Sequence, residues 1–198
     1  MVTHPKNIER ERTVPEVYAE GLRYFMGEGT INKTLARLAN DLEQRGIDYM
    51  VIGAIALLAH GYPRFTENID LVMTSEGRQR FNDELKRLRS TIDGVSIEVM
   101  TTGEFPGDGK PKPVSMPRPN EASVEIDGIR FVTLEKLIEL KLASGMSAPD
   151  RLKDLADVQE LIKLKHLDAD FALKLDPYVR PKYLELEAAV RRNNEHTE

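Results

Sequence analysis

A short extended segment near the middle of the chain carries side chains that suit cation binding. In the predicted strand Asn68–Met73, Asn68 and Asp70 are two residues apart. Alternate side chains of a strand share one face, so both should point the same way while Ile69 enters the core. Carboxylate and amide oxygens are hard ligands of the kind that Mg²⁺ or Mn²⁺ accepts. The segment therefore predicts an oxygen-ligated cation beside this strand.

A turn suited to anion binding precedes this strand. The apolar run Tyr49–Ile52 ends at Gly53, and the small-residue pattern Ala54–Ala59 then predicts a helix. Backbone N–H groups at such a strand-to-helix turn are able to face a phosphate. A cation on one side and a phosphate on the other is the chemistry that these two features suggest. Gly53 also fits the simpler role of a close-packing glycine at a strand end.

Periodicity predicts the elements that hold these residues in place. Helical patterns cover residues 30–45, 54–60 and 74–89. Alternation over Val95–Met100 predicts a strand with Ser96 and Glu98 on one face, and Asp127-Gly128 between apolar runs predicts a hairpin with a type I′ turn. The predicted fold class is therefore α+β, a mixed β-sheet flanked by helices.

The second half of the chain is predicted to be a C-terminal helical bundle. Thr133 starts a helix that Gly145 is expected to end, and a second helix opens near Pro149. A short helix and a final one, ending near Arg192, follow. The predicted divisions are an N-terminal arm at 1–29, a core at 30–132, a helical region at 133–192 and a frayed tail at 193–198.

Composition limits the possible chemistry. The 198 residues are 40% hydrophobic and include no cysteine, which excludes disulfides, thiolate zinc sites and cysteine nucleophiles. The net charge of −5 confines any nucleic-acid contact to a local basic patch. We expect no membrane-spanning segment, because no apolar run is long enough, and the polar N-terminus does not fit a signal peptide. A cytoplasmic location is the expectation.

The order of these motifs resembles that of the DNA polymerase β-like nucleotidyltransferase superfamily. The shared features are a strand ending at Gly53-Ala54, a strand bearing Asn68-Ile69-Asp70, and Glu98 as the candidate third carboxylate on a later strand. The connector HGYPRFT, the loop FPGDGKPKPV and the helical stretch from LIELKLASGM to RLKDLADVQEL are similar to those of the small bacterial branch around AbiEii-type toxins. The resemblance covers roughly residues 32–185.

The resemblance implies a nucleotidyltransferase-like sheet and an enzyme that uses an NTP. It implies Mg²⁺ or Mn²⁺ held by Asn68, Asp70 and Glu98, and transfer of a nucleotide to an acceptor hydroxyl on RNA, tRNA or protein. It also implies a toxin paired with an antitoxin protein. Thr66 matches a threonine that is usual in the family, and the family places a lysine at the position of Lys141 towards the nucleotide phosphates.

Two residues depart from the family pattern within the site itself. Asn68 stands where the family has its first aspartate, and Ala54 stands where it has glycine or serine. A neutral amide removes one full charge from the metal site, so we expect weakened activity. The alternative function is a catalytically silent module that binds a nucleotide or a partner with the same fold. A solvent-facing strand surface is the simplest alternative for the three polar side chains.

Cationic residues elsewhere allow two interpretations each. Arg64 either contacts phosphate or solvates the connector before Thr66. Lys141 either reaches the nucleotide phosphates or extends along apolar surface into water. Arg151 either lies near the substrate, with Asp157 or Asp154 orienting Lys141, or belongs to an ordinary ion-paired helix surface.

The proline-rich loop 105–114 carries two further cations. Lys110 and Lys112 lie beside prolines, which stiffen a loop. The two side chains are expected either to meet substrate phosphates or to form a solvated turn.

Overall fold

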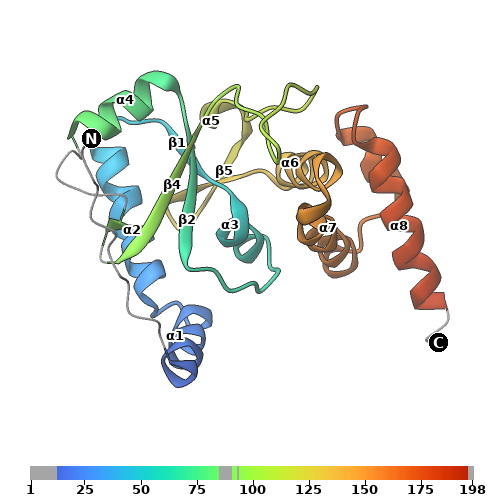
Figure 1. Ribbon diagram of the computed structural model, residues 1–198, viewed down its shortest axis with the longest axis horizontal. Coiled ribbons are helices and arrows are strands. Elements are labelled where there is room, and N and C mark those ends of the chain that lie inside the picture. The colour runs from blue at the N-terminus through green and yellow to red at the C-terminus, as the bar shows by residue number, and fades with distance from the viewer. Residues whose placement is uncertain (1–12, 85–90, 93, 196–198) are drawn as a thin grey trace, which may run out of the picture.

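The computed structural model describes residues 13–84, 91–92 and 94–195, and a mixed β-sheet lies at its centre (Figure 1). Within these residues the sheet has six strands in the order β3-β4-β2-β1-β6-β5. The strands are β1 Tyr49–Val51, β2 Asn68–Met73, β3 Thr91–Ile92, β4 Val95–Thr101, β5 Ser123–Ile126 and β6 Ile129–Val132. Parallel pairs join β2 to β4 and β1 to β6, and the other neighbours are antiparallel.

Helices surround this sheet, which confirms the predicted α+β class. They are α1 Val14–Phe25, α2 Thr30–Gln44, α3 Gly53–Ala59, α4 Ser75–Glu84, α5 Pro119–Ala122, α6 Leu134–Ser147, α7 Leu152–Lys165 and α8 Arg180–Glu195, with 3₁₀ turns at Pro149–Arg151 and Ala169–Lys174. Helix α2 packs on β2, β4 and β6, and α3 packs on β2 and β6. Helices α6, α7 and α8 lie together beside the sheet (Figure 1). None of the helices in the described ranges has both the length and the apolar character needed to cross a membrane.

Local sequence explains why β2 presents its polar residues to one side. Ile69 and Leu71 are fully buried, whereas Asn68 and Asp70 are only partly buried. This is the alternation expected of a strand with one face in the core. The β5–β6 hairpin also follows the prediction, because Asp127 and Gly128 both have positive φ, at 51° and 76°.

The prediction that Gly145 ends its helix is wrong. Helix α6 continues to Ser147, and Gly145 lies at its contact with α7. A Cβ at this position would lie 2.6 Å from both Cδ2 and Cγ of Leu155. The glycine is therefore required by the close approach of two helices and not by a helix end. In the predicted helix over 74–89, Phe81 is buried as expected, and Leu85 and Leu88 lie outside the described residues.

Replacing Gly145 by alanine is expected to destabilise the fold by about 1–3 kcal/mol, because overpacking displaces Leu155. Gly21 in α1 has no atom within 4 Å of its ideal Cβ. The matched change Gly21→Ala should instead be neutral or stabilising, by up to about 1 kcal/mol. Urea denaturation of both variants checks this pair, and equal free energies of unfolding would contradict it.

Candidate functional site

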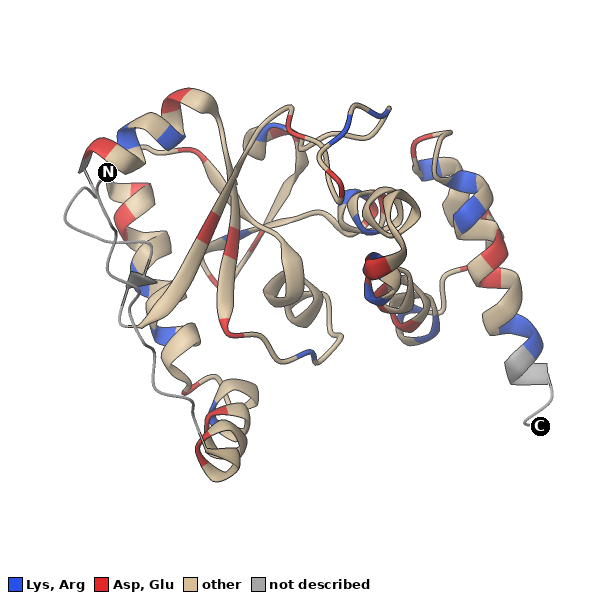
Figure 2. Cartoon of the chain, in the orientation of Figure 1, with Lys and Arg blue, Asp and Glu red and all other residues tan. Residues whose placement is uncertain are grey.

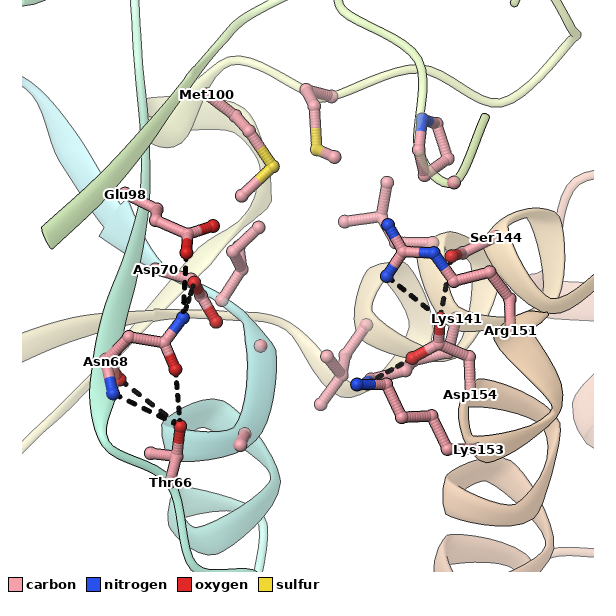
Figure 3. A pocket seen from close by; sticks show the side chains of 18 of the residues that line it. Thr66, Asn68, Asp70, Glu98, Met100, Lys141, Ser144, Arg151, Lys153 and Asp154 are labelled. Atoms are coloured by element: carbon pink, nitrogen blue, oxygen red, sulfur yellow. Dashed lines mark hydrogen bonds and ion pairs between the residues drawn. The ribbon is translucent and has the colours of Figure 1, made fainter. Parts of the chain in front are cut away.

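The acidic side of the site is built by two neighbouring strands. Strands β2 and β4 run parallel with Asp70 directly opposite Glu98, so the two carboxylates lie side by side. Asn68 lies on the same face of β2, and its Nδ2 donates to Asp70 Oδ1 at 2.9 Å and to Glu98 Oε1 at 3.3 Å (Figure 3). The Thr66 hydroxyl donates to Asn68 Oδ1 at 2.7 Å, which holds the amide in this orientation. Asn68 therefore links the two carboxylates through its nitrogen.

The neighbouring carboxyl groups of Asp70 and Glu98 favour the binding of a positive charge. Burial, and after it the neighbouring Glu98 carboxylate, raise the pKa of Asp70 to about 6. Lys141, Arg64 and Lys153 oppose this shift without cancelling it. A cation between the two carboxylates would favour the ionised form of Asp70, so its binding would stabilise the fold at neutral pH.

The raised pKa of Asp70 predicts a pH dependence of stability. A carboxyl group with a higher pKa in the folded than in the unfolded state contributes its full stability below about pH 4, and this contribution is lost as pH rises through about 6. Asp70→Asn removes the ionisable group and with it this loss of stability at high pH. Without ligand, the free energy of unfolding of the variant should exceed that of the unsubstituted protein by about 2 kcal/mol at pH 7.5. At pH 4 the two free energies should be equal. Thermal unfolding at both pH values measures this, and a pH-independent difference would contradict it.

Gly53 gives Asp70 the room that it needs. Its φ is +68°, and a Cβ there would lie 2.0 Å from Asp70 Oδ2. Both the backbone conformation and the contact therefore require glycine. The next residue, Ala54, is 8% exposed and begins the buried side of α3. The structure thus places Gly53 in the close-packing role, and an additional role towards a phosphate stays a prediction.

The basic side of the site is built by α6, α7 and the connector before β2. Lys141 is only 9% exposed, and its Nζ donates to Asp154 Oδ1 and Asp157 Oδ2, both at 2.7 Å. Arg64 pairs with the same Asp157 oxygen. Arg151 Nη1 lies 3.9 Å from Asp154 Oδ2. Two carboxylates therefore hold three cations in a fixed arrangement.

Burial excludes the interpretation of this cluster as a solvent-exposed helix surface, and its role towards phosphates stays a prediction. Asp154 and Asp157 are 5% and 4% exposed, so they do not belong to an ordinary helix surface, and Lys141 does not extend into water. Burial alone would raise the pKa of Asp154. The charge of Lys141 and the hydrogen bonds from Lys141 and Ser144 outweigh burial and hold this pKa below its ordinary value. Asp154 is thus ionised at neutral pH.

The acidic and basic sides line one cavity of about 590 Å³. Figure 2 shows acidic positions on β2 and β4 in the sheet and both signs of charge on α6 and α7. The predicted site residues that line the cavity are Gly53, Ala54, Arg64, Thr66, Asn68, Asp70, Glu98, Lys141, Arg151 and Asp154. Asp157 is not among the lining residues, since it lies behind Lys141 and Arg64, which it binds.

Other residues of the cavity were missed by the sequence patterns. They are Ile52, Met100, Phe105, Pro106, Gly107, Met116, Leu137, Leu140, Ser144 and Lys153. Ser144 follows Lys141 by three residues, so helical spacing would have placed both on one face. Its hydroxyl donates to Asp154 Oδ2 at 2.7 Å. The loop residues carry no local signal that would have directed them to the cavity.

The structure shows neither alternative for Lys112, contact with substrate phosphates or a solvated turn. Its side chain is only 7% exposed, and its Nζ donates to Pro106 O and to Asp108 Oδ1, both at 2.7 Å. The lysine therefore fixes its own loop. Lys110 is 81% exposed in its side chain and does not line the cavity.

The acidic side could bind Mg²⁺ only if substrate phosphates and water supplied the remaining ligands. In the described part of the chain, no group of three or more His, Cys, Asp or Glu side chains is placed to hold a metal. Asp70 and Glu98 supply two carboxylates, and Mg²⁺ often takes no more than that, with substrate phosphates and water completing its shell. Asn68 presents its nitrogen to this pair, so its amide would have to turn before the oxygen could act as a ligand.

Among known proteins, only solved structures are similar to this chain. No protein-family model and no curated protein sequence matches the chain. Among solved structures, ANT(2")-Ia, in complex with adenylyl-2"-tobramycin, is similar at 17% identity and a TM-score of 0.49, covering 83% of this chain and 99% of that chain. A candidate nucleotidyltransferase from Thermotoga maritima is 19% identical with a TM-score of 0.42, covering 68% of this chain and 91% of its own.

A third similar structure is an antigenic nucleotidyltransferase-like protein from Paracoccidioides brasiliensis. It is 17% identical with a TM-score of 0.44, covering 67% of this chain and 75% of that chain. Two of these three structures are thus described as a nucleotidyltransferase or as like one. At these identities and TM-scores they do not establish the family of this chain.

Proposed function

We propose that this protein is a metal-dependent nucleotidyltransferase that moves a nucleotide from an NTP to an acceptor hydroxyl. The observation that carries the proposal is the division of one cavity into an acidic side, with Asp70 beside Glu98, and a basic side centred on Lys141. Phosphates are held in proteins by the joint action of cations and carboxylate-bound metal, and this cavity has the side chains for both.

In the proposed reaction an acceptor oxygen forms a bond to the α-phosphorus while the bond to the leaving pyrophosphate breaks. The hydroxyl proton passes to Glu98 or to water. Asp70 and Glu98 would hold Mg²⁺ or Mn²⁺, which when bound neutralises phosphate charge. Lys141, Arg64 and Arg151 would stabilise charge on the pyrophosphate. Because Asp154 and Asp157 already fix Lys141 and Arg64, these cations need little rearrangement when substrate binds.

The finer parts of the proposal rest on the sequence motifs alone. An acceptor hydroxyl on RNA, tRNA or protein, and the role of a toxin paired with an antitoxin, follow from the resemblance to the AbiEii-type branch. The charges of the cavity are compatible with each of these acceptors and select none of them.

One observation favours a second function, that of a catalytically silent nucleotide-binding module. The Asn68 amide donates a hydrogen bond to each of the two carboxylates that would hold the metal. It thereby supplies partial positive charge to the pair while adding no carboxylate ligand. Such a site would bind nucleotide through Lys141, Arg64 and Arg151 with slow turnover or none.

Transfer from α-labelled nucleotide separates the two functions. The protein is incubated with each of the four α-³²P-labelled NTPs, Mg²⁺ or Mn²⁺, and total RNA, and the RNA and the protein are both examined for label. We expect weak labelling that Asp70→Ala abolishes and that Lys110→Ala, an exposed change outside the cavity, leaves intact. NTP binding with no label in any reaction, even with the Asn68→Asp form, would favour the silent module.

A further inference from the structure

One wall of the cavity is apolar, and nothing in the proposed chemistry of phosphates uses it. Met100 comes from the end of β4, and Phe105, Pro106 and Met116 come from the loop that follows. We call these four residues the apolar wall. Met116 is 5% exposed, and Leu140 of α6, also 5% exposed, lines the same cavity from the helical side.

Met100 of the apolar wall lies beyond one end of the acidic pair, and Thr66, which Arg64 precedes in the chain, lies beyond the other (Figure 3). Met100 is on the same face of β4 as Glu98 and is about 7 Å further along the strand. Figure 3 shows Met100 beyond Glu98, with Asn68 and Thr66 on the opposite side of Asp70. Arg64 precedes Thr66 in the chain and shares the Asp157 oxygen with Lys141, so these two cations lie together.

Hydrogen bonds hold the apolar wall in a fixed shape. Met116 N donates to Glu104 O, and Gly103 N donates to Met116 O, both at 2.8 Å. Lys112 ties Pro106 O and Asp108 Oδ1 together from inside the loop.

The loop also rests on the end of α6. Asp108 N donates to Ser147 Oγ at 3.2 Å, and a Cβ on Gly107 would lie 2.1 Å from the same Ser147 oxygen. The wall is thus formed before any ligand arrives, and preorganisation of this kind lowers the entropic cost of binding.

We infer that the apolar wall binds the nucleobase of the NTP donor. The inference rests on the proposed function, in which the phosphates extend from the acidic pair towards Lys141 and Arg64. The nucleoside then extends the other way, towards Met100 and the loop. Thioether and aromatic side chains make favourable contacts with flat rings, and a preformed cavity of this size suits a nucleotide.

The chemistry of the apolar wall also limits its selectivity. Its four side chains carry no hydrogen-bonding group stronger than a thioether sulfur. They contact the faces and edges of a base without hydrogen-bonding its exchangeable groups. The four NTPs should therefore bind with dissociation constants within about tenfold of one another, because strong discrimination requires buried polar groups that pair with one substrate only.

Calorimetric titration of the full chain with Mg²⁺ tests the inference. The probes are ATP, GTP, CTP, UTP and inorganic tripolyphosphate, which has the phosphates without a base. We expect each NTP to bind at least about tenfold more tightly than tripolyphosphate. Met100→Ala should raise the NTP dissociation constants about fivefold, the loss of one thioether contact, and leave tripolyphosphate unchanged. Met116→Leu, which keeps side-chain volume, is a second variant, and Lys110→Ala is the control.

Several results would overturn the inference. Equal binding of NTPs and tripolyphosphate would show that the base makes no useful contact. An unchanged NTP dissociation constant in Met100→Ala, with a raised KM for the acceptor, would assign the apolar wall to the acceptor. Equal binding of NTPs and tripolyphosphate together with full transfer activity would leave the proposed function standing while the base site fails. Failure of every probe to bind would reject the proposed function as well.

Discussion

Asn68→Asp is expected to raise nucleotidyl transfer by about 100-fold over the chain with Asn68. The change restores a third carboxylate beside Asp70 and Glu98 and removes the amide that now donates to both of them. A better-held metal stabilises transition-state charge by several kcal/mol, and each 1.36 kcal/mol corresponds to a tenfold rate. Initial rates of label transfer from α-labelled NTP, at saturating Mg²⁺, measure the difference.

Two control measurements distinguish the effect of the added carboxylate charge from the effect of removing the amide. Asn68→Ala removes the amide without adding a carboxylate, so it should not exceed the natural rate by more than a few-fold. In Asn68→Asp, three adjacent carboxylates should destabilise the metal-free fold, and Mg²⁺ should raise its Tm more than that of the natural protein. An Asn68→Ala rate as high as that of Asn68→Asp would contradict the role assigned to the charge.

Lys141→Met is expected to destabilise the fold by about 3–5 kcal/mol. Lys141 is buried between Asp154 and Asp157, so its loss leaves two buried carboxylates that Arg64 and Arg151 compensate only in part. Removing one partner of a buried ion pair carries a cost of this size because the remaining charge is not solvated. Urea denaturation at pH 7 gives the free energy of unfolding.

A control variant at an exposed lysine and a double variant test whether the lost stability comes from the buried ion pairs of Lys141. Lys163 of α7 is 45% exposed in its side chain and pairs with Glu160 on the surface, so Lys163→Met should change stability by less than about 1 kcal/mol. Adding Asp154→Asn to Lys141→Met removes one of the buried carboxylates that have lost their lysine partner. The double variant should therefore recover part of the lost stability. A loss below about 1 kcal/mol for Lys141→Met would mean that the lysine does not hold the cluster together.

Local patterns were sufficient for most helices and strands and for the acidic strand, but not for β3 or α5. Alternation in β2 and β4 is a property of a few consecutive residues, and so is the Asp127-Gly128 turn. The pairing of Asp70 with Glu98 depends instead on the order of strands in the sheet. Only the resemblance to a known family suggested it beforehand.

The contributions of helix packing and of the long loop could not be predicted from local patterns. Gly145 looks like a helix end in sequence, and only the approach of Leu155 from another helix explains it. Lys112 looks like a solvent-facing cation among prolines, yet it satisfies the carbonyl of Pro106 inside the loop. The burial of Asp154 and Asp157 likewise requires α6 and α7 to be packed together.

The position of the label in the NTP tests the central proposal most directly. The natural chain and its Asn68→Asp form are each incubated with α-³²P-labelled and with γ-³²P-labelled NTP, Mg²⁺ and total RNA. The proposed function predicts that label from the α position enters RNA or protein, that label from the γ position leaves as pyrophosphate, and that Asp70→Ala stops both. Transfer of γ-label to the acceptor, or NTP binding without any transfer by either form, would contradict it.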